Sequence, residues 1–307
     1  MKAVFLGTAS MVPTKHRNVS SVFVEHLGDC YLCDCGEGTQ RQMNIAGLNR
    51  HRVNTVLISH WHGDHMSGLI GLLQTKDKVP EPEPVTIIGP NGSKDHMDHL
   101  LQSCHFNLSY DVEVVEVPRS EDFDWSNDET RVEACYLDHG VPCVGFRIAE
   151  RAKRRVKMDA LREKGVPEGP HIGELQGGQV VTYDGKQLDP DTYTYIPEED
   201  VVAYVVDTRP CEGARRLADQ ANVLIAEATF DNDTQKRARE YGHMTAEEAA
   251  EIAVDATVDR LFLTHFSQRF RDVKPLAEEA RSVFDDTVPA KDFLEVNVPA
   301  AESERSD

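Results

Sequence analysis

One short segment carries an unusual density of side chains that bind metals. It is Ser59-His-Trp-His-Gly-Asp-His65, which places three imidazoles and one carboxylate within six positions. On a helix, His60 and His62 would face different sides, so the four side chains converge only on a tight loop. Neutral imidazole and carboxylate are the ligands that zinc prefers in catalytic sites. The segment therefore predicts a metal site, and the alternative is a set of polar residues on an exposed turn.

One loop cannot complete the coordination of two ions, so further ligands must come from elsewhere in the chain. Three candidates, His139, Asp207 and His265, each follow a short apolar run that we interpret as a strand. Open α/β folds place their sites where strand ends meet, so we expect these residues to join the histidine-rich loop. Any one of them alone would more simply be a polar loop residue. Together with the loop they predict a metal-dependent active site.

Strands and helices mixed along the chain must position these residues. Apolar, β-branched runs predict strands at 2–6, 20–26, 31–34, 53–58, 85–88, 112–117, 131–137, 144–148, 201–206, 223–226 and 260–264. Helical spacing predicts helices near 39–46, 66–74, 93–103, 245–256 and 273–284. The fourth of these helices has a clear start signal, because Thr245 can cap it while Glu248 completes a capping box. The alternation indicates a layered α/β fold.

Residues 150–197 interrupt this alternation. They are basic at first, over Arg151–Arg155, and then rich in Gly and Pro without a long apolar run. Such a segment cannot build much core of its own, so we interpret it as an inserted arm. The main domain would then comprise residues 1–149 and 198–298, followed by a frayed tail over 299–307.

The charge balance is strongly acidic, with 33 basic and 53 acidic residues, a net charge of −20 and a pI near 5.0. Solubility alone could explain this excess, but we favour adaptation to high salt. An acidic excess normally argues against nucleic-acid partners, because phosphate contacts need local positive charge. Clusters at Arg151–Arg155 and Arg269–Arg271 could supply that charge. No apolar run approaches the roughly 20 residues of a membrane span, and the start lacks a signal peptide, so we expect a cytoplasmic protein without membrane partners.

Seven cysteines make an odd count, which argues against a disulfide framework in a chain without a secretory signal. Cys30, Cys33 and Cys35 lie close together, yet no second pair of ligands follows at zinc-finger spacing. Their segment is typical of a strand. We expect buried or half-buried thiols.

The motif His-x-His-x-Asp-His at residues 60–65 resembles the signature of the metallo-β-lactamase fold. The resemblance implies an αββα four-layer sandwich with two zinc ions per subunit. Two such metals can polarise a phosphate and stabilise a leaving oxygen. It also implies the ligand sets: His60, His62 and His139 for one zinc, Asp64, His65 and His265 for the other, and Asp207 as the bridge.

Further local matches resemble ribonuclease Z, the tRNA 3′-processing endonuclease. They are the opening Phe5–Ser21 with its Pro-x-x-x-Arg loop at Pro13–Arg17, then Asp34–Gln42, Glu227–Thr229 with His243, and Leu263–Phe270. The resemblance spans roughly residues 1–296. One departure is Val206, where the family commonly has Gly before the aspartate, and the acidic net charge is another.

The resemblance to ribonuclease Z implies cleavage of precursor tRNA on the 3′ side of the discriminator base. The tRNA would keep a 3′-hydroxyl and the trailer a 5′-phosphate. Asp64 would orient the attacking water or take its proton, and His243, positioned by Glu227, would protonate the leaving oxygen. Plainer interpretations are a helix-entry residue for His243 and a strand-end carboxylate for Glu227.

The same resemblance implies how the RNA is held. The arm at 150–197 would be an exosite that grips the tRNA elbow, in a homodimer where one subunit's arm serves the other's site, and no DNA partner is expected. The implied substrate contacts are Pro13, Arg17, Thr229 and Arg269 in the main domain and Gly173 and Gly177 in the arm.

Three other functions remain open on the sequence. A non-catalytic RNA-binding module with structural zinc is disfavoured, because structural sites are usually closed by four ligands, often thiolates. A small-molecule hydrolase of the same fold, such as a thioesterase or arylsulfatase-like enzyme, is disfavoured by the arm and by the Pro13–Arg17 loop. A broad-specificity phosphodiesterase could use the same metal site.

Overall fold

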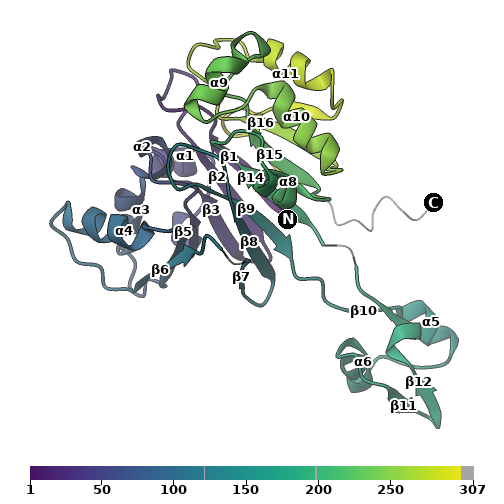
Figure 1. The fold of residues 1–307 in the computed structure, drawn as a ribbon. Coiled ribbons are helices and arrows are strands. Elements are labelled where there is room, and N and C mark those ends of the chain that lie inside the picture. The colour runs from purple at the N-terminus through teal and green to yellow at the C-terminus, as the bar shows by residue number, and fades with distance from the viewer. Residues whose placement is uncertain (121, 198, 299–307) are drawn as a thin grey trace. The chain divides into compact units, whose positions relative to one another are not determined.

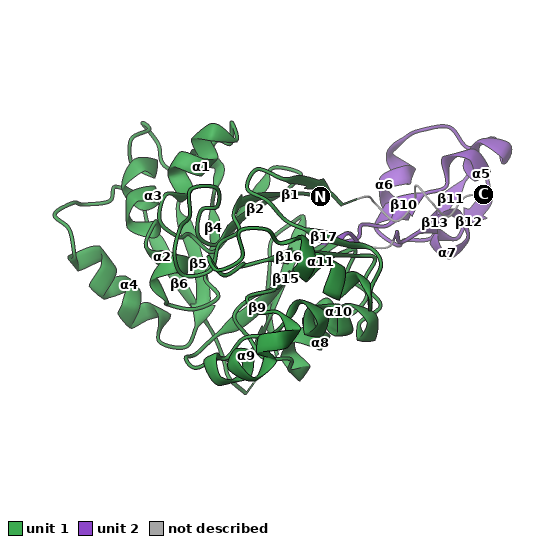
Figure 2. Cartoon of the chain, turned by 90° about the horizontal axis from the view of Figure 1, so that it is seen from above, with its two compact units in different colours: residues 1–149, 201–298 green, residues 150–200, 299–307 purple. Residues whose placement is uncertain are grey.

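The computed structural model describes residues 1–120, 122–197 and 199–298 (Figure 1). They divide into two compact units, one of residues 1–149 with 201–298 and one of residues 150–200 (Figure 2). The expected frayed tail at 299–307 lies outside the described residues.

The first seven-stranded sheet has the order β18-β1-β2-β3-β4-β5-β6. Its strands are β1 (Lys2–Gly7), β2 (Ser21–His26), β3 (Asp29–Cys33), β4 (Thr55–Leu57), β5 (Val85–Pro90), β6 (Val112–Val117) and β18 (Glu295–Asn297). Strands β3 to β6 are parallel, whereas β1 pairs antiparallel with both β2 and β18. The two ends of the described chain therefore lie in neighbouring strands.

The second sheet has the order β17-β16-β15-β14-β9-β8-β7. Its strands are β7 (Phe123–Ser126), β8 (Thr130–Tyr136), β9 (Val144–Glu150), β14 (Val201–Val205), β15 (Val223–Glu227), β16 (Arg260–Thr264) and β17 (Thr287–Pro289). Strands β14 to β17 are parallel, so β14 and β16 point their carboxyl ends toward the same edge.

A shared apolar core joins the two sheets face to face. It contains Phe5 and Tyr31 from the first sheet and Phe146, Tyr204 and Phe262 from the second, all at most 3% exposed. Helices cover the outer faces (Figure 1). They are α1 (Thr39–Ile45), α2 (Gly63–Met66), α3 (Leu69–Lys76) and α4 (Ser93–Gln102) on one side and α8 (Glu212–Ala218), α9 (Gln235–Tyr241), α10 (Ala246–Asp255) and α11 (Lys274–Arg281) on the other. The predicted αββα sandwich is confirmed.

Each expected strand and helix is present, with small shifts of the ends. The capping box of Thr245 and Glu248 at the start of α10 is confirmed. The helix expected at 66–74 corresponds to α3 but begins later, at Leu69, because the separate helix α2 ends at Met66. The break lies at Gly68, where a Cβ would be 2.2 Å from the carbonyl oxygen of Gly36. Backbone packs on backbone there.

The cysteines behave as expected, since all seven are free and Cys30, Cys33 and Cys35 are buried. Burial raises the pKa of Cys30 to about 11 and that of Cys35 to about 12. Within the described residues, no helix has the length and apolar character needed to cross a bilayer.

The second unit has secondary structure and a core of its own. Its elements are β10 (Arg155–Val156), α5 (Met158–Glu163), α6 (Pro170–Gln176), β11 (Val181–Tyr183), β12 (Lys186–Leu188), α7 (Pro190–Tyr193) and β13 (Thr194–Tyr195). Its core comprises Leu161, Val166, Leu175, Val181 and Leu188, each at most 5% exposed. This segment was expected to build little core of its own, and these five buried residues form a small one. Its apolar residues are spread singly over short elements, so no run reveals them.

Candidate metal centre and active site

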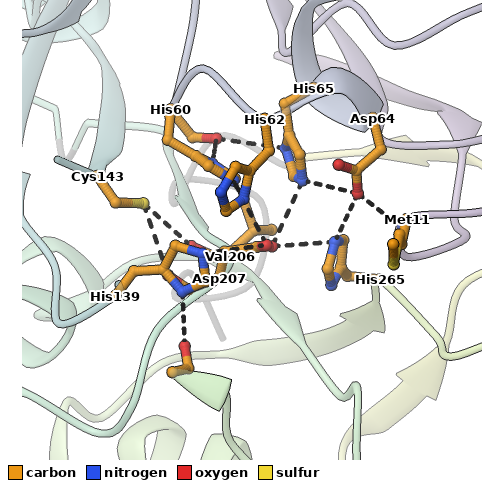
Figure 3. A network of polar contacts seen from close by, with 12 residues as sticks. Met11, His60, His62, Asp64, His65, His139, Cys143, Val206, Asp207 and His265 are labelled. Carbon is orange, nitrogen blue, oxygen red and sulfur yellow. Dashed lines mark hydrogen bonds and ion pairs between the residues drawn. The ribbon is translucent and has the colours of Figure 1, made fainter. Parts of the chain in front are cut away.

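The histidine-rich loop runs from the end of β4 into α2, and its side chains meet those that follow β8, β14 and β16 (Figure 3). Three groups of candidate ligands result, in each of which the ligand atoms lie within 4.8 Å of one another. One of them is Asp207, His243 and His265, and the other two contain the seven residues predicted as ligands. They are His60, His62, His139 and Asp207 in the first group and Asp64, His65 and His265 in the second. The structure thus brings together all seven residues singled out in the sequence.

Asp207 lies between the two groups and offers one carboxylate oxygen to each. Its Oδ2 is 3.6 Å from Nε2 of His60 and 4.0 Å from Nε2 of His139. Its Oδ1 is 3.0 Å from Nε2 of His265 and 3.6 Å from Nε2 of His65. Either oxygen of this carboxylate could therefore serve as a metal ligand.

Four imidazoles have their Nδ1 atoms fixed by a neighbour, so each turns Nε2 toward the centre. The pairs are His60 with the hydroxyl of Ser59 (3.0 Å), His65 with Asp34 (2.7 Å), His139 with the carbonyl of Gly242 (2.9 Å) and His265 with the hydroxyl of Thr229 (2.9 Å). Such outer contacts set the tautomer and ring orientation of histidines that bind metals.

Four inner atoms of the site form no hydrogen bond among the described residues. Nε2 of His65, His139 and His265 and Oδ1 of Asp207 are buried and form no hydrogen bond within the part of the chain that the structure describes. Leaving one buried polar atom unsatisfied costs about 1–3 kcal/mol. A convergent set of such nitrogens and oxygens fits divalent cations, which would satisfy them all.

The pKa shifts of the histidines differ across the site. Despite burial, Asp207 raises the pKa of His265 to about 10 and that of His65 well above its usual value. Burial lowers the pKa of His60 and of His62. Burial would raise the pKa of Asp207, but the contact with His265 lowers it more strongly, to well below its usual range. The pKa of Asp64 is also lowered, because contact with His265 outweighs the effect of burial. Neutral imidazoles and ionised carboxylates are the forms that bind metal ions.

Four residues of the site have left-handed backbone conformations, which cost L-residues about 1–2 kcal/mol each. They are Met11, Asp34, Asp207 and His265, with φ between 51° and 57°. At each of them the chain turns sharply at the sheet edge. Met11 donates its backbone N–H to Oδ2 of Asp64 over 2.7 Å. Strain of this kind concentrates at functional sites.

His243 lies at the rim of the centre. Its Nδ1 is 3.0 Å from Oε2 of the fully buried Glu227, which also accepts the backbone N–H of Thr208. Burial opposes a charge on the ring, but Glu227 raises the pKa of His243 overall. The ring lies 5.3 Å from that of His139 and 5.7 Å from that of His265. An imidazole held this way can donate a proton from Nε2.

The other predicted contacts are distributed over both units. Arg17 donates to the carbonyl of Phe270 over 2.9 Å, and the exposed Arg269 lies 4.7 Å above the ring of Phe230. Pro13 is exposed in the loop that leads to Arg17.

The remaining predicted substrate contacts are Thr229, next to the metal centre, and two glycines of the second unit. Thr229 is 4% exposed and hydrogen-bonds to His265, a position from which it orients that ring. Gly173 and Gly177 lie within and just after α6 of the second unit.

Sequence reasoning assigned no role to Asp34 and missed Gly242. Asp34 follows β3 and binds His65 from behind. Its signals were its position at a strand end and its place in the Asp34–Gln42 match to ribonuclease Z. A Cβ at Gly242, where φ is 78°, would lie 2.7 Å from Nδ1 of His139. Only a glycine at this helix end lets the backbone carbonyl reach the imidazole.

Comparison with known proteins agrees with this geometry. Residues 30–266 match the family model of the beta-lactamase superfamily domain. Ribonuclease Z of Salinibacter ruber is 42% identical over 305 residues, which cover 97% of this chain and 95% of that protein. Ribonuclease Z of Methanothermobacter thermautotrophicus is 37% identical and covers 99% and 98% of the two chains.

A solved structure of similar extent gives the same result. The crystal structure of human tRNase Z, short form, superposes with a TM-score of 0.70 at 27% identity and covers 97% of this chain and 100% of that one. With relatives above 30% identity along nearly the whole chain, this protein belongs to the ribonuclease Z family of the beta-lactamase superfamily and is a hydrolytic endoribonuclease.

Proposed function

We propose that this protein is a zinc-dependent endoribonuclease that removes the 3′ trailer from precursor tRNA. The observation that carries the proposal is the pair of ligand groups sharing Asp207, with the His243–Glu227 pair at their rim. The names of its relatives, ribonuclease Z and tRNase Z, support tRNA as the substrate.

We assign His60, His62 and His139 to one zinc ion, Asp64, His65 and His265 to a second, and Asp207 to both. Two divalent ions in such a site polarise the phosphate, acidify a water molecule and stabilise the developing charge. The set of donors, all imidazoles and carboxylates, suits open catalytic zinc sites better than closed structural ones.

The protein's own groups then handle the protons. Asp64, whose Oδ2 is held by the N–H of Met11, orients the attacking water or takes its proton. Attack at phosphorus breaks the bond to the 3′ oxygen of the discriminator nucleotide, and His243 protonates that oxygen from Nε2. The products are a tRNA with a 3′-hydroxyl and a trailer with a 5′-phosphate.

Substrate binding rests on both units in this proposal. Pro13, Arg17 and Arg269 contact the RNA near the cleaved bond, while residues 150–197, with Gly173 and Gly177, grip the tRNA elbow as an exosite. The enzyme acts as a homodimer in which one subunit's exosite serves the other's site. Mixing a subunit carrying Asp64→Ala with one lacking the exosite should then restore activity that neither has alone, and failure to restore it would exclude this arrangement.

The decisive experiment incubates the purified protein with a 3′-extended precursor tRNA and maps the product ends. Because the net charge is −20, potassium chloride should be varied up to molar concentrations, and we expect activity to require high salt. Cleavage beside the discriminator base supports the proposal. Cleavage elsewhere, or of unrelated phosphodiesters with equal efficiency, would favour a broad-specificity phosphodiesterase instead.

A further inference from the structure

A row of four rings leads from the metal centre to the surface. The ring centroids of His265 and His243 are 5.7 Å apart, those of His243 and Phe230 5.9 Å, and those of Phe230 and Tyr241 6.4 Å. The first three rings are buried or nearly so, with 1% exposure at His265, 14% for the side chain of His243 and 4% at Phe230, whereas Tyr241 is 60% exposed. The last two rings are nearly parallel, at 13°. The row therefore ends in an open aromatic face.

Cationic side chains flank the same row. The guanidinium of Arg269 lies 4.7 Å from the ring of Phe230, and that of Arg237 lies 5.9 Å from the ring of Tyr241. Both arginines are exposed, as is Lys236, which precedes Arg237 on α9. In a protein with a net charge of −20, a basic helix next to the centre is unusual. It provides local positive charge where a polyanion must enter.

We infer that Tyr241 stacks on an unpaired base of the RNA substrate, and that Arg237 binds the adjoining phosphate. Exposed aromatic rings next to arginines are the common means of holding single-stranded RNA, because every base offers a π-face. The inference rests on the proposed function and adds a substrate contact on α9. The expected occupant is the discriminator nucleotide, the last one that the tRNA retains.

The position of His243 selects this nucleotide. In the proposed reaction His243 protonates the leaving 3′ oxygen, which belongs to the discriminator ribose. The row starts at that imidazole and continues outward through Phe230, so the base attached to the same ribose is the one that reaches the open face of Tyr241. The trailer leaves from the opposite side of the cleaved bond.

A structural role for Tyr241 does not explain its placement. The side chain is 60% exposed and ends α9, just before Gly242, whereas the buried ring of Phe230 supplies the packing beneath it. Removing the outer ring leaves the described contacts of His243 with Glu227 intact. The Tyr241→Ala variant should therefore fold and bind metal normally.

The test compares Tyr241→Ala, Tyr241→Phe and Arg237→Ala with the wild type on precursor tRNA. Stacking is worth about 1–3 kcal/mol per base, so we expect Tyr241→Ala to raise KM about tenfold with little change in kcat. Tyr241→Phe should retain the wild-type KM, because the ring remains. Hydrolysis of bis(p-nitrophenyl) phosphate should be unchanged in all three variants. Val254→Ala, which trims an exposed apolar side chain of α10, is the matched control.

A precursor that lacks the base at the discriminator position allows a double-mutant cycle between the protein and the RNA. The wild type should lose about as much affinity for this substrate as Tyr241→Ala loses for the intact one, and the two changes together should cost no more than either. Additive losses, or an unchanged KM in Tyr241→Ala, would overturn the stacking contact. Failure of the wild type to cleave the unmodified precursor would instead refute the proposed function, so the two failures are distinct.

Discussion

Oδ2 of Asp34 lies 2.7 Å from Nδ1 of His65, and both residues are fully buried. The same carboxylate accepts hydrogen bonds from the backbone N–H and the hydroxyl of Ser59 and from the hydroxyl of Tyr204. Asp34 and Ser59 follow strands β3 and β4 of the first sheet, whereas Tyr204 lies in β14 of the second sheet. One buried carboxylate therefore fixes both sheets and a candidate metal ligand at once.

Replacing Asp34 with Asn should lower the affinity of the site for the metal ion assigned to His65. An amide presents an NH₂ group to neighbours that are themselves donors, so the ring of His65 loses its fixed orientation. Loss of such an outer contact typically costs 10–100-fold in metal affinity, and we expect a loss of about that size. Competition with a chromophoric chelator measures it. Asp124→Asn, on the exposed face of β7, is the control, and equal affinity in both variants would contradict the role of Asp34.

Gly242→Ala should disturb His139 beyond the cost of its backbone conformation. A left-handed φ costs an alanine about 1–2 kcal/mol, and the new Cβ would also lie 2.7 Å from Nδ1 of His139. Gly47→Ala is a matched control, because Gly47 has a similar φ of 69° and open space at its Cβ. We expect both variants to unfold at lower denaturant concentration, but only Gly242→Ala to lose metal. Equal metal content in the two would exclude this contact as important.

Deletion of residues 150–200 should leave the first unit folded. Ala149 and Val201 are direct cross-strand partners in β9 and β14, so a short Gly/Ser linker spans the gap without moving either strand. We expect hydrolysis of bis(p-nitrophenyl) phosphate to survive, whereas KM for precursor tRNA should rise at least about tenfold, because remote contacts help only a large substrate. Loss of both activities in a folded variant would place this unit in the chemistry, and retention of both would remove it from binding.

Thiol labelling should separate the cysteines by burial. The exposed Cys104 should react rapidly at pH 8, and the half-buried Cys135 and Cys211 more slowly. The buried cysteines should remain silent, because a pKa of about 11 at Cys30 or about 12 at Cys35 leaves almost no thiolate at that pH. Denaturation should then expose seven thiols without reductant. Fewer than seven would reveal a disulfide.

The ligand positions could be predicted because they combine a dense local motif with polar residues at strand ends. The close spacing of His60 and His62 predicts a shared metal site, and His265 follows a strand that its apolar residues predict. The roles of Gly242 and Asp34 could not be assigned in this way, although Asp34 also follows a strand. Each acts on an imidazole distant in the chain, through a carbonyl or a carboxylate, so its role depends on how separate segments pack. Sequence periodicity carries no information about such pairs.

The shortest strands could not be predicted from the sequence for a different reason. Strands β17 and β18 have three residues each, too few for an alternating pattern to appear. Their place is set by their partners, β16 and β1. The core of residues 150–200 was missed because Leu161 or Leu188 alone, among charged neighbours, gives no apolar run. These residues come together only in the tertiary structure, where they pack into one cluster.

The pairing of β1 with β18 has a consequence for how the chain reaches its native state. Lys2 lies opposite Asn297, and Val298 donates its backbone N–H to the carbonyl of Met1. During synthesis, the edge of β1 that pairs with β18 therefore remains bare until residues 295–297 have left the ribosome. Bare strand edges invite pairing with other chains. Nascent chains should thus be most vulnerable to aggregation late in translation, and joining the two ends by circular permutation should shorten that interval.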